Sequence, residues 1–140
     1  MDKRFWIAGI VASLLFFLLG FLVHGLLMTD DYMRIKSMFR SEQDAMSFMP
    51  LMILAHVIMG FAFVWIYSRG ISDAPWWMQG IRFGIAAVLL VTVPWYLIYY
   101  SVQPWPGSTV AKMTIYDSLS LIITAIAVAF IYKPAAAELS

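Results

Sequence analysis

The chain has 140 residues, of which 63% are hydrophobic and 12% are charged, and its net charge is +1. This composition excludes an ordinary soluble domain, because the apolar runs are about 20 residues long, enough to cross the ~30 Å hydrocarbon layer of a bilayer. The scattered basic residues indicate no nucleic-acid-binding surface, and the absence of cysteine excludes disulfides, thiolate metal sites and a cysteine nucleophile.

Four apolar segments follow one another along the chain, at about 5–28, 49–67, 76–100 and 110–132. Because every backbone amide in hydrocarbon needs an internal partner, each segment predicts a transmembrane helix. The first is too long for the apolar region of a signal peptide and has no small-residue cleavage site after it, so we expect it to be a span. The sequence therefore predicts an all-α membrane protein, one domain over 1–140 arranged as a four-helix bundle, with a frayed tail at its end.

The segment at 29–48 connects the first two spans and is rich in charged residues. If it is helical, Tyr32, Ile35, Met38 and Phe39 fall on one side, and the basic residues fall on others. This pattern predicts a short amphipathic helix in the membrane interface, on the outer side. A solvated loop with one helical turn explains the same pattern equally well.

Lysine and arginine residues near the ends of the spans predict the orientation. Five lie on one side of the membrane and four on the other: Lys3, Arg4, Arg69, Arg82 and Lys133 against Arg34, Lys36, Arg40 and Lys112. This small excess, with the even number of spans, places both termini in the cytoplasm, and we expect the membrane to be the inner membrane of a bacterium.

Small residues predict where the helices approach one another. They form stripes at helical spacing in the first, third and fourth spans: Gly9, Ser13 and Gly20; Gly80 and Gly84; Thr114, Thr124 and Ala125. Pro94 lies inside the third span, where it removes one backbone hydrogen bond and predicts a kink toward the outer end.

Three ionisable residues lie deep inside the spans: His24, His56 and Asp117. Counted from the outer ends of their helices at ~1.5 Å per residue, they occupy one layer about 6 to 10 Å deep. Ionisable groups at this depth normally face the protein interior and find partners. The plainest interpretation is a structural cluster in which Asp117 accepts a hydrogen bond from one histidine, completed by Thr114, Ser118 or a tyrosine.

The same layer supports two cofactor hypotheses. His24, His56 and Asp117 together offer a ligand set for a transition metal ion such as zinc, iron or copper. Alternatively, the two histidines are axial ligands of haem b, with Gly20 and Gly60 leaving room for the flat macrocycle. Close packing of neighbouring helices requires glycine at the same two positions, so the glycines do not distinguish these interpretations.

Methionines in the outer half of the spans raise a further hypothesis, thioether ligation of Cu(I). They are Met28, Met33, Met38, Met46, Met49, Met52, Met59 and Met113. Methionine is also a flexible filler of apolar cores, and this explanation is the stronger one.

The sequence contains no phosphate-binding loop, nucleophile elbow, HExxH motif or paired carboxylates, which disfavours an enzyme. We expect a non-catalytic membrane subunit or accessory protein of a larger redox assembly, in contact with lipid and with other membrane subunits or a second copy. The alternative is a small oligomeric transporter or channel coupled to protons or cations, in which Asp117 and the histidines exchange protons.

Five short stretches resemble a class of small uncharacterised bacterial inner-membrane proteins with four spans. They are GFLVHG at 20–25, DDYMRI at 30–35, MFRSEQDA at 38–45, GIRFG at 80–84 and QPWPG at 103–107. The resemblance extends over nearly the whole chain. It implies a four-helix topology and no particular activity.

Overall fold

The computed structural model describes residues 2–133, which contain helices and connecting turns but no strand. Four helices are long and apolar enough to cross a membrane: Lys3–Leu27, Met49–Arg69, Trp76–Val102 and Gly107–Tyr132. Their ends lie within three residues of the predicted spans, the largest difference being a start at Gly107 instead of 110. The expected tail after Lys133 lies outside the described residues.

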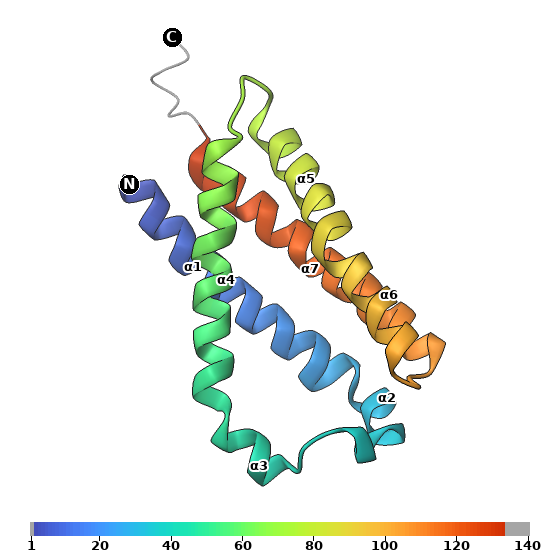
Figure 1. Ribbon diagram of the computed structural model, residues 1–140. Helices are drawn as coiled ribbons and strands as arrows, with labels where there is room; N and C mark the ends of the chain where they lie inside the picture. The colour runs from blue at the N-terminus through green and yellow to red at the C-terminus, as the bar shows by residue number, and fades with distance from the viewer. Residues whose placement is uncertain (1, 134–140) are drawn as a thin grey trace.

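The four long helices run side by side along the molecule (Figure 1), and the first and third each contain a π-helical segment. The first consists of α1 (Lys3–Gly20) and the π-helix η1 (Phe21–Leu27), and the third of α5 (Trp76–Ala87), the π-helix η3 (Val88–Thr92) and α6 (Val93–Val102). The second and fourth are continuous, as α4 (Met49–Arg69) and α7 (Gly107–Tyr132). Three short helices connect the first two long ones: α2 (Thr29–Arg34), the 3-10 helix η2 (Lys36–Met38) and α3 (Glu42–Ser47).

Helix α1 packs against α4 and α7, and α5 packs against α7 (Figure 1). Glycines make these approaches close. A Cβ atom on Gly60 would lie 2.2 Å from Ser13 Oγ and 2.5 Å from the Ser13 backbone nitrogen. A Cβ on Gly80 or Gly84 would lie 2.9 Å from the Cα of Ile126 or Ile122, respectively. The predicted small-residue stripes therefore do face neighbouring helices.

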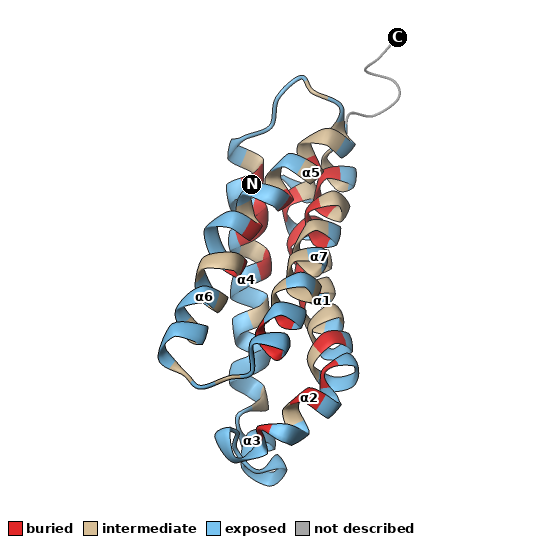
Figure 2. Ribbon diagram, turned by 90° about the vertical axis from the view of Figure 1, so that its right-hand side faces the viewer, coloured by how far each residue is buried: buried red, intermediate tan, exposed pale blue. Residues whose placement is uncertain are grey.

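Buried residues lie along the facing sides of the long helices (Figure 2), and most buried hydrophobic side chains belong to two clusters. The larger one lies where α1, α4 and α7 meet and includes Ala12, Phe16, Val64 and Ala125. The smaller one, which consists of Val23, Met28, Val110 and Met113, lies where η1 meets the start of α7. Nearly all residues in the first half of α4, in contrast, are exposed. The exposed surface of the long helices is largely apolar, as contact with lipid requires.

Each π-helical segment contains a hydrogen bond to the carbonyl five residues earlier. The Met28 N–H donates to the Val23 carbonyl oxygen at 2.9 Å, and the Val93 N–H donates to that of Val88. Pro94 follows directly and has no N–H with which to continue an α-helical pattern. At Pro94, where the sequence predicts a kink, the structure has a π-helical turn just before the proline, and nothing in the sequence predicted the π-helical turn of η1.

Candidate functional site

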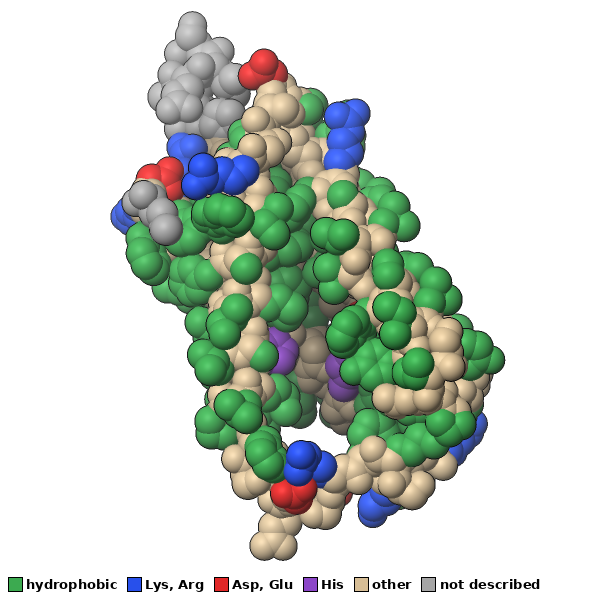
Figure 3. All heavy atoms as spheres, viewed as in Figure 1, with side chains coloured by type: hydrophobic (Ala, Val, Ile, Leu, Met, Phe, Trp, Pro, Cys, Tyr) green, Lys and Arg blue, Asp and Glu red, His purple; other side chains and the backbone are tan. Residues whose placement is uncertain are grey.

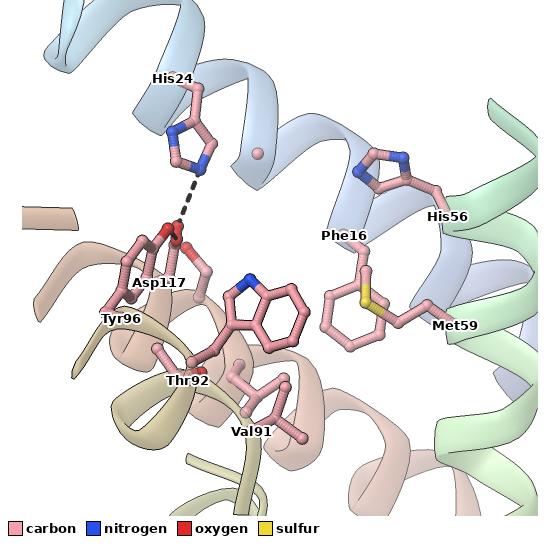
Figure 4. A pocket seen from close by; sticks show the side chains of 12 residues that line it. Phe16, His24, His56, Met59, Val91, Thr92, Tyr96 and Asp117 are labelled. Atoms are coloured by element: carbon pink, nitrogen blue, oxygen red, sulfur yellow. Dashed lines mark hydrogen bonds and ion pairs between the residues drawn. The ribbon is translucent and has the colours of Figure 1, made fainter. Parts of the chain in front are cut away.

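A cavity of about 230 Å³ lies between the four long helices, with both π-helical segments in its wall (Figure 4). Helices α1 and η1 contribute Phe16, Gly20 and His24, and α4 contributes His56 and Met59. The third helix contributes Val91, Thr92, Trp95 and Tyr96, and α7 contributes Asp117, Ser120 and Leu121. His24, His56 and Asp117, the three residues singled out in the sequence, thus line one cavity.

His24 and Asp117 are joined directly across the space between η1 and α7 (Figure 4). Nε2 of His24 lies 3.2 Å from Oδ1 of Asp117, and their side chains are 38% and 23% exposed, respectively. The other carboxylate oxygen, Oδ2, accepts a hydrogen bond from the Tyr96 hydroxyl. Asp117 therefore links the first, third and fourth long helices through two hydrogen-bond partners.

The network continues from His24 to Tyr32 in α2. Nδ1 of His24 lies 2.5 Å from the Tyr32 hydroxyl oxygen, and the two rings are stacked with their centroids 6.0 Å apart. The same hydroxyl lies 3.3 Å from the sulfur of Met113. Burial raises the pKa of Tyr32 above its usual range, and the carboxylates of Asp117 and Asp31 add to this effect. Tyr32 therefore keeps its proton at neutral pH.

The Tyr32 hydroxyl has one proton and two possible acceptors, His24 Nδ1 and the Met113 sulfur. Which of them accepts depends on the charge of His24. If Tyr32 donates to His24 Nδ1, only Nε2 of the ring carries a proton, and the imidazole is neutral. If Tyr32 donates to the Met113 sulfur, Nδ1 is free to donate back, and the ring is an imidazolium paired with the Asp117 carboxylate. His24 and Tyr32 keep a hydrogen-bond partner in both arrangements, and only the Met113 sulfur gains or loses a donor.

His56 lies on the opposite side of the cavity and is not part of this network. Its Nδ1 lies 2.7 Å from the backbone carbonyl oxygen of Met52, and its ring makes an edge contact with Phe17 at a centroid distance of 5.5 Å. Because a carbonyl only accepts, Nδ1 carries a proton, so in the neutral form of the ring Nε2 presents a lone pair. No hydrogen-bond partner for Nε2 is found within residues 2–133.

The two glycines of the haem hypothesis have different surroundings. Gly20 lines the cavity, and a Cβ there would make an ordinary contact of 3.5 Å with His56 Nε2. Gly60 does not line the cavity, since it packs against the backbone of Ser13. The packing explanation therefore accounts for Gly60.

The described part of the chain contains no group of three histidine or acidic side chains placed to hold one metal ion. His56 and the pair formed by His24 and Asp117 face the same cavity without forming such a group. The methionines do not gather at one site either. Met28 and Met113 are buried in the smaller core, Met59 lines the cavity, and Met33 and Met46 are 62% and 64% exposed.

A second cavity, of about 390 Å³, lies next to the network on the side of α2 and the end of α6. His24, Trp95 and Tyr96 line both cavities, and Tyr32, Tyr99 and Trp105 line only the second. The side chains of His24, Trp95 and Tyr96 therefore lie between the two spaces.

Helix α2 is attached to α7 by an ion pair between a buried carboxylate and a half-exposed lysine. Nζ of Lys112 lies 2.8 Å from Oδ2 of Asp31, and the Thr109 hydroxyl donates to Oδ1 at 3.4 Å. The Asp31 side chain is 5% exposed, and the hydrogen bond from Lys112 lowers its pKa despite the opposing effect of burial. This pair fixes α2, and with it Tyr32, beside the cavity.

Sequence reasoning identified His24, His56 and Asp117 but missed Tyr32 as a partner of His24. Tyr32 belongs to an amphipathic pattern, and nothing in that pattern distinguishes an interfacial ring from a hydrogen-bond partner. The tyrosine that completes the cluster is Tyr96, which follows the π-helical turn and donates its hydroxyl hydrogen to Asp117.

Comparison with known proteins finds no matching family model, no matching curated protein and no matching solved structure. The fold itself defines the class: an all-helical protein with four helices long and apolar enough to cross a membrane.

Proposed function

We propose that this protein is a non-catalytic integral membrane subunit or accessory protein that binds a small molecule in the cavity between its four long helices. The observation that carries this proposal is the convergence of His24, His56 and Asp117, from three different helices, on one cavity with mainly apolar walls. Ligand sites of membrane and soluble proteins share this combination of apolar walls with a few polar groups. Ionisable residues inside a span are also more often functional than incidental.

The volume and the state of His24 favour an organic ligand over haem b. Both ring nitrogens of His24 already face a partner, so axial ligation would require breaking the contact with Asp117 or with Tyr32. The volume of about 230 Å³ lies between a ~150 Å³ cavity that binds benzene and typical drug-sized sites of ~300 Å³ or more. A porphyrin, with its four pyrrole rings, is much larger than benzene. Purified protein with a Soret band, lost in His24→Ala, would reverse this preference.

The experiment is native mass spectrometry of protein purified from its own membrane. Gly20→Leu places a large side chain in the cavity, and Ala86→Leu adds the same group to an exposed position on α5. We expect a bound species on the wild type and on Ala86→Leu, and its loss from Gly20→Leu. Equal occupancy of all three proteins, or no bound species on any of them, contradicts the proposal.

A second candidate function, proton-coupled transport, is favoured by one specific observation. The hydrogen-bonded chain from Tyr96 through Asp117 and His24 to Tyr32 contains ionisable groups and lies beside two cavities. Transporters use such chains to exchange protons near a substrate site. Reconstituted vesicles with an imposed pH gradient test it: proton flux that is lost in Asp117→Asn supports transport, and equal flux through protein-free vesicles excludes it.

We also propose that both termini lie in the cytoplasm of a bacterium, with the long helices crossing the inner membrane as a bundle. In this orientation α2, η2 and α3 lie in the outer interface. The distribution of lysine and arginine supports it, as does the ion pair that holds α2 against the start of α7.

A further inference from the structure

We propose that the ligand of the cavity is a lipid-soluble molecule ending in a hydroxyl-bearing ring, which enters sideways from the bilayer between α4 and α6 and donates its hydroxyl hydrogen to His56 Nε2. This inference rests on the proposed function and adds the chemical class of the ligand, its route and the residue that recognises it.

The route follows from where the cavity opens. Its floor is formed by α1 and α7, and its sides by α4 and by η3 with α6 (Figure 4). Figure 3 shows the hollow between α4 and α6, with both histidines visible inside it. At the mouth, Met59, Val91 and Trp95 are 41%, 57% and 56% exposed. An opening with an apolar rim on the side of membrane-spanning helices faces acyl chains, so a molecule dissolved in lipid has direct access.

The polar group of the ligand follows from the state of His56. Its Nδ1 is committed as a donor to the Met52 carbonyl, which leaves an acceptor at Nε2. Gly20 lies beside this nitrogen and has no side chain, so it leaves space there for a ligand. A ligand with a hydroxyl satisfies Nε2, whereas the same ligand with a methyl ether does not. The carboxylate oxygens of Asp117 already have partners, so His56 is the better recognition group.

The size and walls of the cavity indicate a ring. An engineered apolar cavity of ~150 Å³ binds benzene, so about 230 Å³ accommodates one substituted six-membered ring. Phe16, Trp95 and Tyr96 provide aromatic surfaces for it. The remainder of a longer molecule would extend through the mouth into lipid.

The test compares 4-pentylphenol with 4-pentylanisole, in which a methyl group replaces the hydroxyl hydrogen. Binding of each radiolabelled probe is measured on protein in lipid nanodiscs. One hydrogen bond contributes about 0.5–1.5 kcal/mol, so the phenol should bind roughly 2- to 12-fold more tightly. His56→Phe should bind both probes equally, and His56→Gln, which retains an acceptor, should restore part of the preference.

Each outcome decides between the two proposals. Equal binding of phenol and anisole by the wild type, with both lost in Gly20→Leu, overturns recognition by His56 and leaves the cavity as a binding site. Failure of both probes to bind, while a native ligand is detected by mass spectrometry, overturns the ligand class alone. A preference for the phenol that persists in His56→Phe assigns recognition to another residue. Unchanged thermal unfolding of His56→Phe excludes misfolding as the cause.

Discussion

His24 on η1 and Asp117 on α7 face each other with Nε2 and Oδ1 3.2 Å apart, and this contact joins the first and fourth long helices beside the cavity. Side-chain hydrogen bonds between membrane helices are worth about 0.6 kcal/mol on average and about 1.7 kcal/mol at most. We therefore expect a double-mutant cycle of His24→Ala and Asp117→Ala to give a coupling energy in this range. Unfolding in detergent provides the measurement, and strictly additive effects would show that the pair contributes nothing.

Gly60 and Gly20 should respond differently to the same substitution. A Cβ at position 60 meets the Ser13 backbone, which cannot move without separating α1 from α4, whereas a Cβ at position 20 makes only an ordinary contact. We expect Gly60→Ala to lower the free energy of unfolding by about 1–3 kcal/mol, the usual effect of overpacking. Gly20→Ala should be neutral or slightly stabilising, because alanine favours a helix over glycine. Equal effects of the two substitutions in thermal unfolding would contradict this packing.

The ion pair between Asp31 and Lys112 predicts a pH dependence. The hydrogen bond from Lys112 lowers the pKa of Asp31 in the folded protein. A carboxyl group of this kind stabilises the fold above its unfolded pKa of about 3.9 and loses that contribution as the pH falls through the lower folded value. The stability difference between the wild type and Asp31→Asn should therefore be constant above about pH 5 and shrink below about pH 4.

The control for this prediction is Asp30→Asn, since Asp30 is the exposed neighbour of Asp31. Its unfolding temperature should follow that of the wild type at every pH. A difference between the wild type and Asp31→Asn that does not change with pH would exclude the ion pair as its source.

The proposed orientation predicts which loops are reached from outside the cell. The chain contains no cysteine, so a single introduced cysteine is the only site that a maleimide can label. Gln43 in α3 and Asp73 between α4 and α5 are both exposed. A membrane-impermeant maleimide added to intact cells should label Gln43→Cys and leave Asp73→Cys unlabelled until the membrane is permeabilised. The reverse pattern would invert the orientation.

The sequence by itself determined the four long helices and the residues at their contacts. Hydrocarbon allows only internally bonded backbone, so the length of each apolar run fixed its helix closely, as for Met49–Arg69. Gly80 and Gly84 were recognisable as packing positions because membrane helices approach through small residues. Likewise His24, His56 and Asp117 stood out, because ionisable groups are rare at such depth.

Only the tertiary structure decided which of these three residues contact one another. The π-helical segments rotate the residues around His24 and Tyr96 relative to a regular α-helix. A π-helical turn contains one residue more than an α-helical turn, and nothing in the sequence of the first span predicts where this turn occurs. As a result His24 pairs with Asp117 and Tyr32, while His56 stays on the far wall of the cavity. Periodicity places side chains on the face of one helix, but which faces meet depends on how the helices cross and on where each is irregular.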